Sequence, residues 1–294
     1  LEKDFPEVSI VPPTTNEVFD IALKPAQPFA LEDMARLSKR ALLNFYVMLD
    51  TIALDCAYIR PGALQSLWRL AARYSDGLIF ISQFSQDQFT RRFRPSPHTA
   101  LLPALCSTDV EDYRYIESES SAGLVQQVDK PFVLVLGNHY EHKFITPTVT
   151  TLIESADTPH VVVLGDCKMK DPRVTVITSG QLNEVVVHRL YRDAQFIVFP
   201  SLYEGFGFPV AHGLAHGKIV CARDSSLNRE IITNWNGSGE LLLYQDTDEL
   251  ARLVTHLLTR GSHGLAEAGF SVLSGNPKAQ YGWPEVALKI ATML

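Results

Sequence analysis

The chain has 294 residues, of which 46% are hydrophobic and 20% charged, and its formal net charge is −7 at pH 7. This length predicts about two domains with a sizeable buried core. No apolar stretch is long enough to span a bilayer, and the near-even charge balance argues against nucleic acid as the main partner. The four cysteines have no C-x-x-C spacing, which is typical of reduced thiols in a cytoplasmic protein.

The amino-terminal part of the chain predicts a loose alternation of strands and helices. Short strands are expected at 8–11, 18–23, 44–49 and 78–81. Helices are expected at 31–43, at 64–74 and from Ser85 to Phe93. The last of these starts at Ser85-Gln-Asp-Gln88, which matches a capping box.

The ends of this first part are less regular. Residues 105–130 are rich in serine and acidic residues and are expected to form a linker. The chain opens at Leu1 without a strand and tight glycine turn, and its first glycine is Gly62, so we expect residues upstream of Leu1. The basic stretch Arg91-Arg-Phe-Arg94 is interpreted as a solvated helix end, or alternatively as a contact with an anionic acceptor or a membrane surface.

From residue 131 the alternation becomes plainer. Strands are expected at 132–136, 160–164, 174–177, 196–199, 218–222 and 240–243. Helices are expected at 147–155, 182–193, 209–216, 248–258 and 284–294, and residues 260–280 are expected to be irregular. This order predicts a parallel sheet with helices on both faces, in which ligands bind beyond the carboxyl ends of the strands. Gly137, Gly165 and Glu204 follow such ends and are expected to share one rim.

The most informative stretch is Pro200-Ser-Leu-Tyr-Glu-Gly-Phe-Gly-Phe-Pro209. Gly205 and Gly207 let the backbone approach a ligand without a Cβ in the way. Pro209 suits the first turn of a helix, whose unpaired N–H groups would favour an anion. Glu204 can accept hydrogen bonds from sugar hydroxyls, or alternatively it caps or pairs locally.

Lys143 lies just past the strand end at Gly137 on the same predicted rim. A lysine there would neutralise a diphosphate; the alternative is a solvated surface lysine. His212 and His216 have the i, i+4 spacing of metal ligands, but no acidic third ligand accompanies them and H-E-x-x-H is absent. No metal site is therefore expected, and neither a P-loop nor a dinucleotide fingerprint occurs.

These motifs resemble the retaining glycosyltransferases of family 4, which have the GT-B fold. The resemblance begins at Phe132-Val-Leu-Val-Leu-Gly137-Asn, with Lys143 downstream, peaks at 200–209 and ends at Trp283-Pro-Glu-Val-Ala287. It implies an α/β protein in which two Rossmann-like domains have parallel sheets facing across a cleft.

The resemblance also implies a domain order. An acceptor-side domain is expected at 1–126, incomplete at its start, and a nucleotide-sugar donor-binding domain at 127–280. A C-terminal helix at 281–294 is expected to pack back on the first domain.

By this resemblance Glu204 is the catalytic carboxylate that orients the donor sugar. The donor-binding residues would be Asn138, Lys143, Gly205, Phe206, Gly207 and His212. Asp50 would lie on the acceptor side. The family's E-x7-E signature is here E-x7-H, because His212 replaces the second glutamate, and Asn138 stands where an arginine is usual.

The sequence therefore predicts a metal-independent hexosyltransferase without a cofactor. It would move a hexosyl unit from a nucleotide-diphosphate sugar, linked to GDP, UDP or dTDP, to a saccharide or lipid-linked saccharide in polysaccharide or glycan assembly. The expected place is the cytoplasm, with a peripheral contact at the inner face of the membrane left open. Two alternatives remain: a GT-B sugar-nucleotide epimerase or phosphorylase, and a catalytically degenerate nucleotide-sugar-binding partner subunit.

Overall fold

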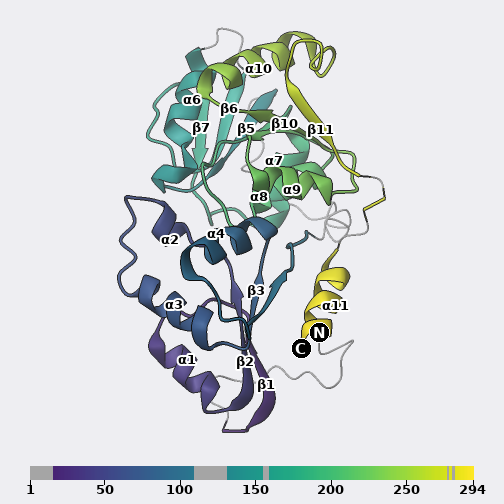
Figure 1. Ribbon diagram of the computed structural model, residues 1–294. Coiled ribbons are helices and arrows are strands. Elements are labelled where there is room, and N and C mark those ends of the chain that lie inside the picture. The colour runs from purple at the N-terminus through teal and green to yellow at the C-terminus, as the bar shows by residue number, and fades with distance from the viewer. Residues whose placement is uncertain (1–15, 109–130, 155–158, 277, 280–281) are drawn as a thin grey trace. The chain divides into compact units, whose positions relative to one another are not determined.

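The computed structural model describes residues 16–108, 131–154, 159–276, 278–279 and 282–294. It divides into two α/β units, one formed by residues 1–107 with 281–294 and the other by residues 108–280. In each unit helices flank a sheet (Figure 1). The strand expected at 8–11, the boundary expected after residue 126 and most of the expected linker lie outside the described residues. No helix in the described ranges is long and apolar enough to cross a membrane.

The first unit is built on a four-stranded parallel sheet in the order β1-β2-β3-β4. Its strands are β1 (Phe19–Lys24), β2 (Ala41–Met48), β3 (Gly77–Phe80) and β4 (Ala100–Pro103). Its helices are α1 (Leu31–Ser38), α2 (Ile52–Asp55), α3 (Leu64–Tyr74), α4 (Gln83–Phe93) and α11 (Trp283–Met293).

The two faces of this sheet are covered by different helices. Side chains alternate along a strand, so Phe80 and Ile79 of β3 enter different clusters. Phe80 packs with Trp68 of α3 and Phe89 of α4. Ile79 packs with Val286 of α11, which brings the C-terminal helix onto the first unit.

Two expected boundaries in this unit are wrong. The helix expected over 31–43 ends at Ser38, and the chain enters β2 at Ala41. Pairing of β2 with β1 and β3 along its length outweighs the local helical pattern of Leu42 and Leu43. The cap of α4 is Ser82 rather than Ser85, because the Ser85 amide donates to the Ser82 hydroxyl at 3.0 Å.

The second unit contains a seven-stranded sheet in the order β11-β10-β9-β8-β5-β6-β7. Its strands are β5 (Phe132–Gly137), β6 (His160–Gly165), β7 (Val174–Ile177), β8 (Ile197–Phe199), β9 (Ile219–Arg223), β10 (Glu240–Tyr244) and β11 (Ser271–Ser274). Its helices are η3 (Glu141–Lys143), α6 (Ile145–Glu154), α7 (Glu184–Asp193), α8 (Phe208–Ala215), α9 (Ser226–Thr233) and α10 (Thr247–Arg260).

The six strands expected in this unit are confirmed as parallel neighbours. The expectation that 260–280 is irregular is wrong at β11, which pairs antiparallel with β10 at the sheet edge. A strand of four residues is too short to give a clear period-two signal.

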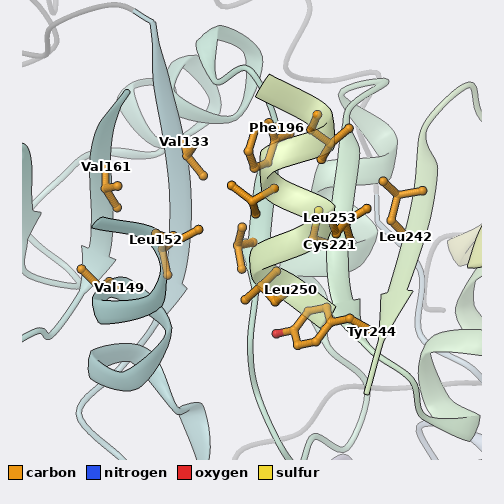
Figure 2. Close-up of a cluster of buried hydrophobic side chains, with 14 of the residues drawn as sticks. Val133, Val149, Leu152, Val161, Phe196, Cys221, Leu242, Tyr244, Leu250 and Leu253 are labelled. Carbon is orange, nitrogen blue, oxygen red and sulfur yellow. The ribbon is translucent and has the colours of Figure 1, made fainter. Parts of the chain in front are cut away.

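The core of the second unit lies between its sheet and the helices α6 and α10, which contact each other. Figure 2 shows Val133 of β5 and Cys221 of β9 among side chains from both helices, including Leu152 and Leu253. Burying each such aliphatic side chain contributes about 1.5–3 kcal/mol. This core holds the strands whose carboxyl ends carry the predicted site residues.

Candidate functional site

The chain changes its direction of travel across the large sheet between β5 and β8. From β5 it moves through β6 to β7, and from β8 it moves the opposite way through β9 to β10. Such a switch point is where ligands bind in open parallel sheets, beyond the carboxyl ends of the strands. Lys143 follows β5 and Glu204 follows β8, so the topology brings both predicted residues to this point.

The end of β5 runs very close to the end of β6. Gly137 pairs with Gly165, and a Cβ on Gly165 would lie 1.5 Å from the Gly137 carbonyl oxygen. Only glycine can therefore occupy position 165. Beyond β5, the Asn138 side-chain oxygen accepts a hydrogen bond from the Tyr140 amide at 3.3 Å, which curls the start of the loop.

The rest of this loop is the single turn η3. The Lys143 amide donates to the Tyr140 carbonyl and the Phe144 amide to the Glu141 carbonyl, each at 3.0 Å. The His142 carbonyl accepts a hydrogen bond from the Leu202 amide at 2.7 Å, which ties this loop to the turn after β8. Burial and the nearby Lys143 charge lower the pKa of His142 to about 4, so this ring is neutral at pH 7.

The turn after β8 leads directly into α8. Ser201 donates its hydroxyl to the Tyr203 carbonyl at 3.0 Å, which tightens the turn. Gly207 caps α8 with φ 87°, a left-handed conformation that favours glycine. Phe206 is buried, so its ring is not available to a ligand.

Lys143 and Glu204 meet in an ion pair that joins the two loops. Their side chains are 14% and 19% exposed, so water screens the pair only partly. The Glu204 side chain also lies against the start of α8, because a Cβ on Gly207 would be 3.9 Å from its Cγ. A cation, a carboxylate and the amino terminus of α8 are therefore gathered at the switch point.

His212 lies on the side of α8 that packs against α7. Its ring centroid is 5.8 Å from that of His188 and 5.9 Å from that of Tyr191. Nδ1 of His216 is 2.8 Å from the His212 carbonyl oxygen, and its Nε2 is 3.1 Å from Nδ1 of His188. A carbonyl only accepts hydrogen bonds, so a neutral His216 carries its proton on Nδ1 and accepts one from His188.

We call His188, His212 and His216 the imidazole cluster. Burial lowers the pKa of all three rings, that of His188 to about 4. The cluster is therefore neutral at pH 7, and a neutral ring at position 212 can donate or accept a single hydrogen bond at each nitrogen. Within the described residues, no group of three or more His, Cys, Asp or Glu side chains is arranged to hold a metal ion.

Comparison with known proteins found similarity to proteins that transfer sugars. Residues 130–260 match the family model described as Glycosyl transferases group 1. The sequence is 25% identical to the O-antigen chain mannosyltransferase RfbU of Salmonella typhimurium. That alignment covers 40% of this chain and 36% of RfbU, so the chain spans about a third of the length of this curated relative.

Solved structures match nearly the whole chain. Sucrose-phosphate synthase from Thermosynechococcus elongatus has a TM-score of 0.64 at 17% identity, over 93% of this chain and 72% of that one. HepE from Anabaena, in complex with UDP and glucose, has a TM-score of 0.64 at 15% identity, over 93% of this chain and 77% of that one. WaaG, a glycosyltransferase involved in lipopolysaccharide biosynthesis, has a TM-score of 0.55 at 13% identity, over 83% of this chain and 79% of that one.

The fold is that of the GT-B glycosyltransferases. The predicted α/β class and GT-B fold are thereby confirmed.

Asp50, the predicted acceptor-side residue of this GT-B chain, belongs to the first unit. Its Oδ1 accepts a hydrogen bond from the Ile52 amide at 3.0 Å, just before α2. The Asp50 amide donates a hydrogen bond to Oε1 of Gln27 at 3.3 Å. In the same unit Arg92, from the basic stretch at the end of α4, forms an ion pair with Asp55, which supports the interpretation of that stretch as a helix end.

One residue of the rim was not predicted from the sequence. Arg223 ends β9, and its guanidinium donates from Nε to the Pro200 carbonyl at 3.3 Å and from Nη1 to the Gln245 carbonyl at 3.0 Å. It also lies over the Phe144 ring, 4.8 Å from the centroid. The available signal was a basic residue directly after a strand, which alone does not distinguish it from a solvated arginine.

Proposed function

We propose that the protein is a retaining glycosyltransferase of family 4 that uses a nucleotide-diphosphate sugar without a metal. It would transfer a hexosyl unit from a GDP-, UDP- or dTDP-linked donor to a saccharide or lipid-linked saccharide. The observation that carries this proposal is the ion pair of Lys143 and Glu204 at the switch point between β5 and β8. The family match over 130–260, which contains both residues, supports it.

The site offers separate groups for the two halves of the donor. Negative charge develops on the diphosphate as the bond to the sugar breaks, and preorganised donors stabilise such charge best. Lys143 and the positive end of the α8 dipole would hold the diphosphate. Glu204 would then leave Lys143 and accept hydrogen bonds from the sugar hydroxyls, while the backbones of Gly205, Phe206 and Gly207 line the sugar.

The nucleotide half of the signature is altered. His212 would contact the ribose through one ring nitrogen, where a glutamate offers two acceptor oxygens. Asn138 carries no charge and its side-chain oxygen already accepts from the Tyr140 amide, which leaves Lys143 as the cation for the diphosphate. These differences affect nucleotide affinity more than they affect sugar orientation.

The donor class is supported by the relatives. HepE was solved with UDP and with UDP-glucose, and RfbU is a mannosyltransferase of the O-antigen chain. The acceptor in our proposal enters from the first unit, with Asp50 contacting it, and the enzyme works in the cytoplasm or peripherally at the inner face of the membrane.

A nucleotide-sugar panel tests the proposal. We expect the enzyme to release the nucleoside diphosphate from UDP-glucose, GDP-mannose or another nucleotide sugar of the panel in the presence of a chelator. NMR of the product should show that the anomeric configuration of the donor sugar is retained. Glu204→Ala should lower the rate by at least about 100-fold.

Three outcomes would contradict the proposal and each points elsewhere. Labelled sugar that isomerises or goes to phosphate indicates an epimerase or a phosphorylase. Nucleotide binding without turnover indicates a partner subunit. An absence of binding to UDP, GDP and dTDP overturns the assignment to a nucleotide-sugar enzyme.

A further inference from the structure

Arg223 connects the ends of three neighbouring strands to the loop that carries Lys143. It is the last residue of β9, and its two hydrogen bonds reach Pro200, just after β8, and Gln245, just after β10. Its guanidinium carbon lies 4.8 Å from the Phe144 ring centroid and 5.6 Å from that of Tyr244. Half-buried between two rings and two carbonyls, this side chain is held on several sides.

Phe144 is the residue of the loop that needs such support. It adopts φ 53°, a left-handed conformation that is uncommon for a bulky side chain. On its far side its carbonyl accepts hydrogen bonds from the Thr148 hydroxyl at 2.8 Å and the Thr148 amide at 3.3 Å. Phe144 directly follows Lys143, so the backbone conformation at Phe144 affects how the Lys143 side chain is oriented relative to the loop.

We propose that Arg223 is a positioning residue that holds the Lys143 loop in its ligand-ready conformation. The guanidinium restrains the Phe144 ring and thereby the strained backbone at that residue, which fixes Lys143 opposite Glu204. The planar group is required, because a lysine cannot donate to two carbonyls while stacking on a ring. The ligand part of this inference rests on the proposed function, whereas the loop part does not.

The loop part is tested on the ligand-free protein by hydrogen–deuterium exchange. The amides of Lys143 and Phe144 are hydrogen-bonded within η3 and should exchange slowly. Arg223→Met should speed their exchange by about tenfold, the change that ~1.4 kcal/mol gives. Arg223→Lys should speed it nearly as much, although it keeps the charge.

Arg173→Met is the matched control. Arg173 also donates to a carbonyl, that of Ile153 at 2.7 Å, and it pairs with Asp171. It precedes β7 and so lies at the opposite, amino edge of the same sheet. Its loss should leave the exchange of the η3 amides unchanged, and an equal increase in both variants would show only a general loosening of the unit.

A double-mutant cycle identifies the contact responsible. Phe144→Leu removes the ring but keeps a non-glycine residue at the left-handed position. If Arg223 acts through that ring, Arg223→Met should add less than about twofold to the exchange of a Phe144→Leu protein. Full additivity of the two substitutions would overturn the proposed route.

The ligand part is tested with UDP, GDP and dTDP by calorimetry. Arg223→Met and Arg223→Lys should both weaken whichever nucleotide the wild type binds by about tenfold, because Lys143 is no longer held in place. Restored affinity in Arg223→Lys would instead show a direct charge contact and overturn the positioning role. If the wild type binds none of the three, the proposed function fails while the exchange experiment still decides the role of Arg223.

Discussion

The ion pair between Lys143 and Glu204 should contribute measurably to stability before any ligand is present. Two unit charges about 3 Å apart attract by about 5–6 kcal/mol at an effective dielectric constant of about 20. Folding removes most of the water from both side chains, which are 14% and 19% exposed, and this desolvation cancels more than half of the attraction. We therefore expect a net coupling of about 1–3 kcal/mol.

A double-mutant cycle measures this coupling. Lys143→Met should lower the free energy of unfolding by about 2–3 kcal/mol, because it leaves the Glu204 carboxylate partly buried without its countercharge. Glu204→Gln should cost about 1 kcal/mol, since the amide oxygen still accepts a hydrogen bond from Lys143. The double variant should be less destabilised than the sum, with unfolding followed by circular dichroism in urea without nucleotide.

The pair of Arg229 and Asp224 is the control. It has two hydrogen bonds of 2.7 Å, but the Arg229 side chain is 49% exposed, so its coupling should stay below about 1 kcal/mol. A Lys143–Glu204 coupling no larger than this control would refute the partly buried ion pair on which the site is built.

Three further predictions concern stability. The rings of the imidazole cluster have pKa values below that of histidine in the unfolded chain, so the stability that they contribute should be complete above about pH 6.5 and fall as the pH drops toward 4. His188→Gln should reduce this pH dependence of the free energy of unfolding, measured by urea titrations at several pH values. An unchanged pH dependence would contradict the lowered pKa of His188. Gly165→Ala should prevent folding or lower the free energy of unfolding by more than about 4 kcal/mol. Gly180→Ala, at φ 82° and with no atom within 4 Å of the added Cβ, should lower it by only about 1 kcal/mol, as measured by thermal melts. Equal losses of stability would argue against the close approach of β5 and β6. Leu253→Ala in the core should cost about 2–5 kcal/mol, against under about 0.5 kcal/mol for exposed Leu202→Ala, by the same melts.

Strong local patterns were sufficient to predict the six parallel strands of the second unit, but not β11. β5 and β6 are continuous apolar runs that end in glycine, at Gly137 and Gly165, so both these strands and their carboxyl ends could be located. The turn at Glu204 and the loop at Lys143 were expected to share a rim, and the structure joins them in an ion pair.

Features that depend on contacts with residues distant in the chain could not be predicted from the sequence. The helix expected to reach Leu43 stops early because β2 is fixed by its two neighbouring strands. Arg223 gains its role from Phe144 and two carbonyls on other segments, which no local pattern contains. The neighbours of His212 come from α7, so its place in the imidazole cluster needed the packing of two helices.

The most direct test of the central claim is calorimetric titration of UDP, GDP and dTDP into the wild type, Lys143→Met and Glu204→Gln. We predict that at least one nucleotide binds the wild type and that Lys143→Met weakens it at least about tenfold. Glu204→Gln should bind it equally or more tightly, because the diphosphate no longer competes with a carboxylate for Lys143. Failure of all three nucleotides to bind, or unchanged affinity in Lys143→Met, would contradict the claim that this switch point is a nucleotide-sugar site.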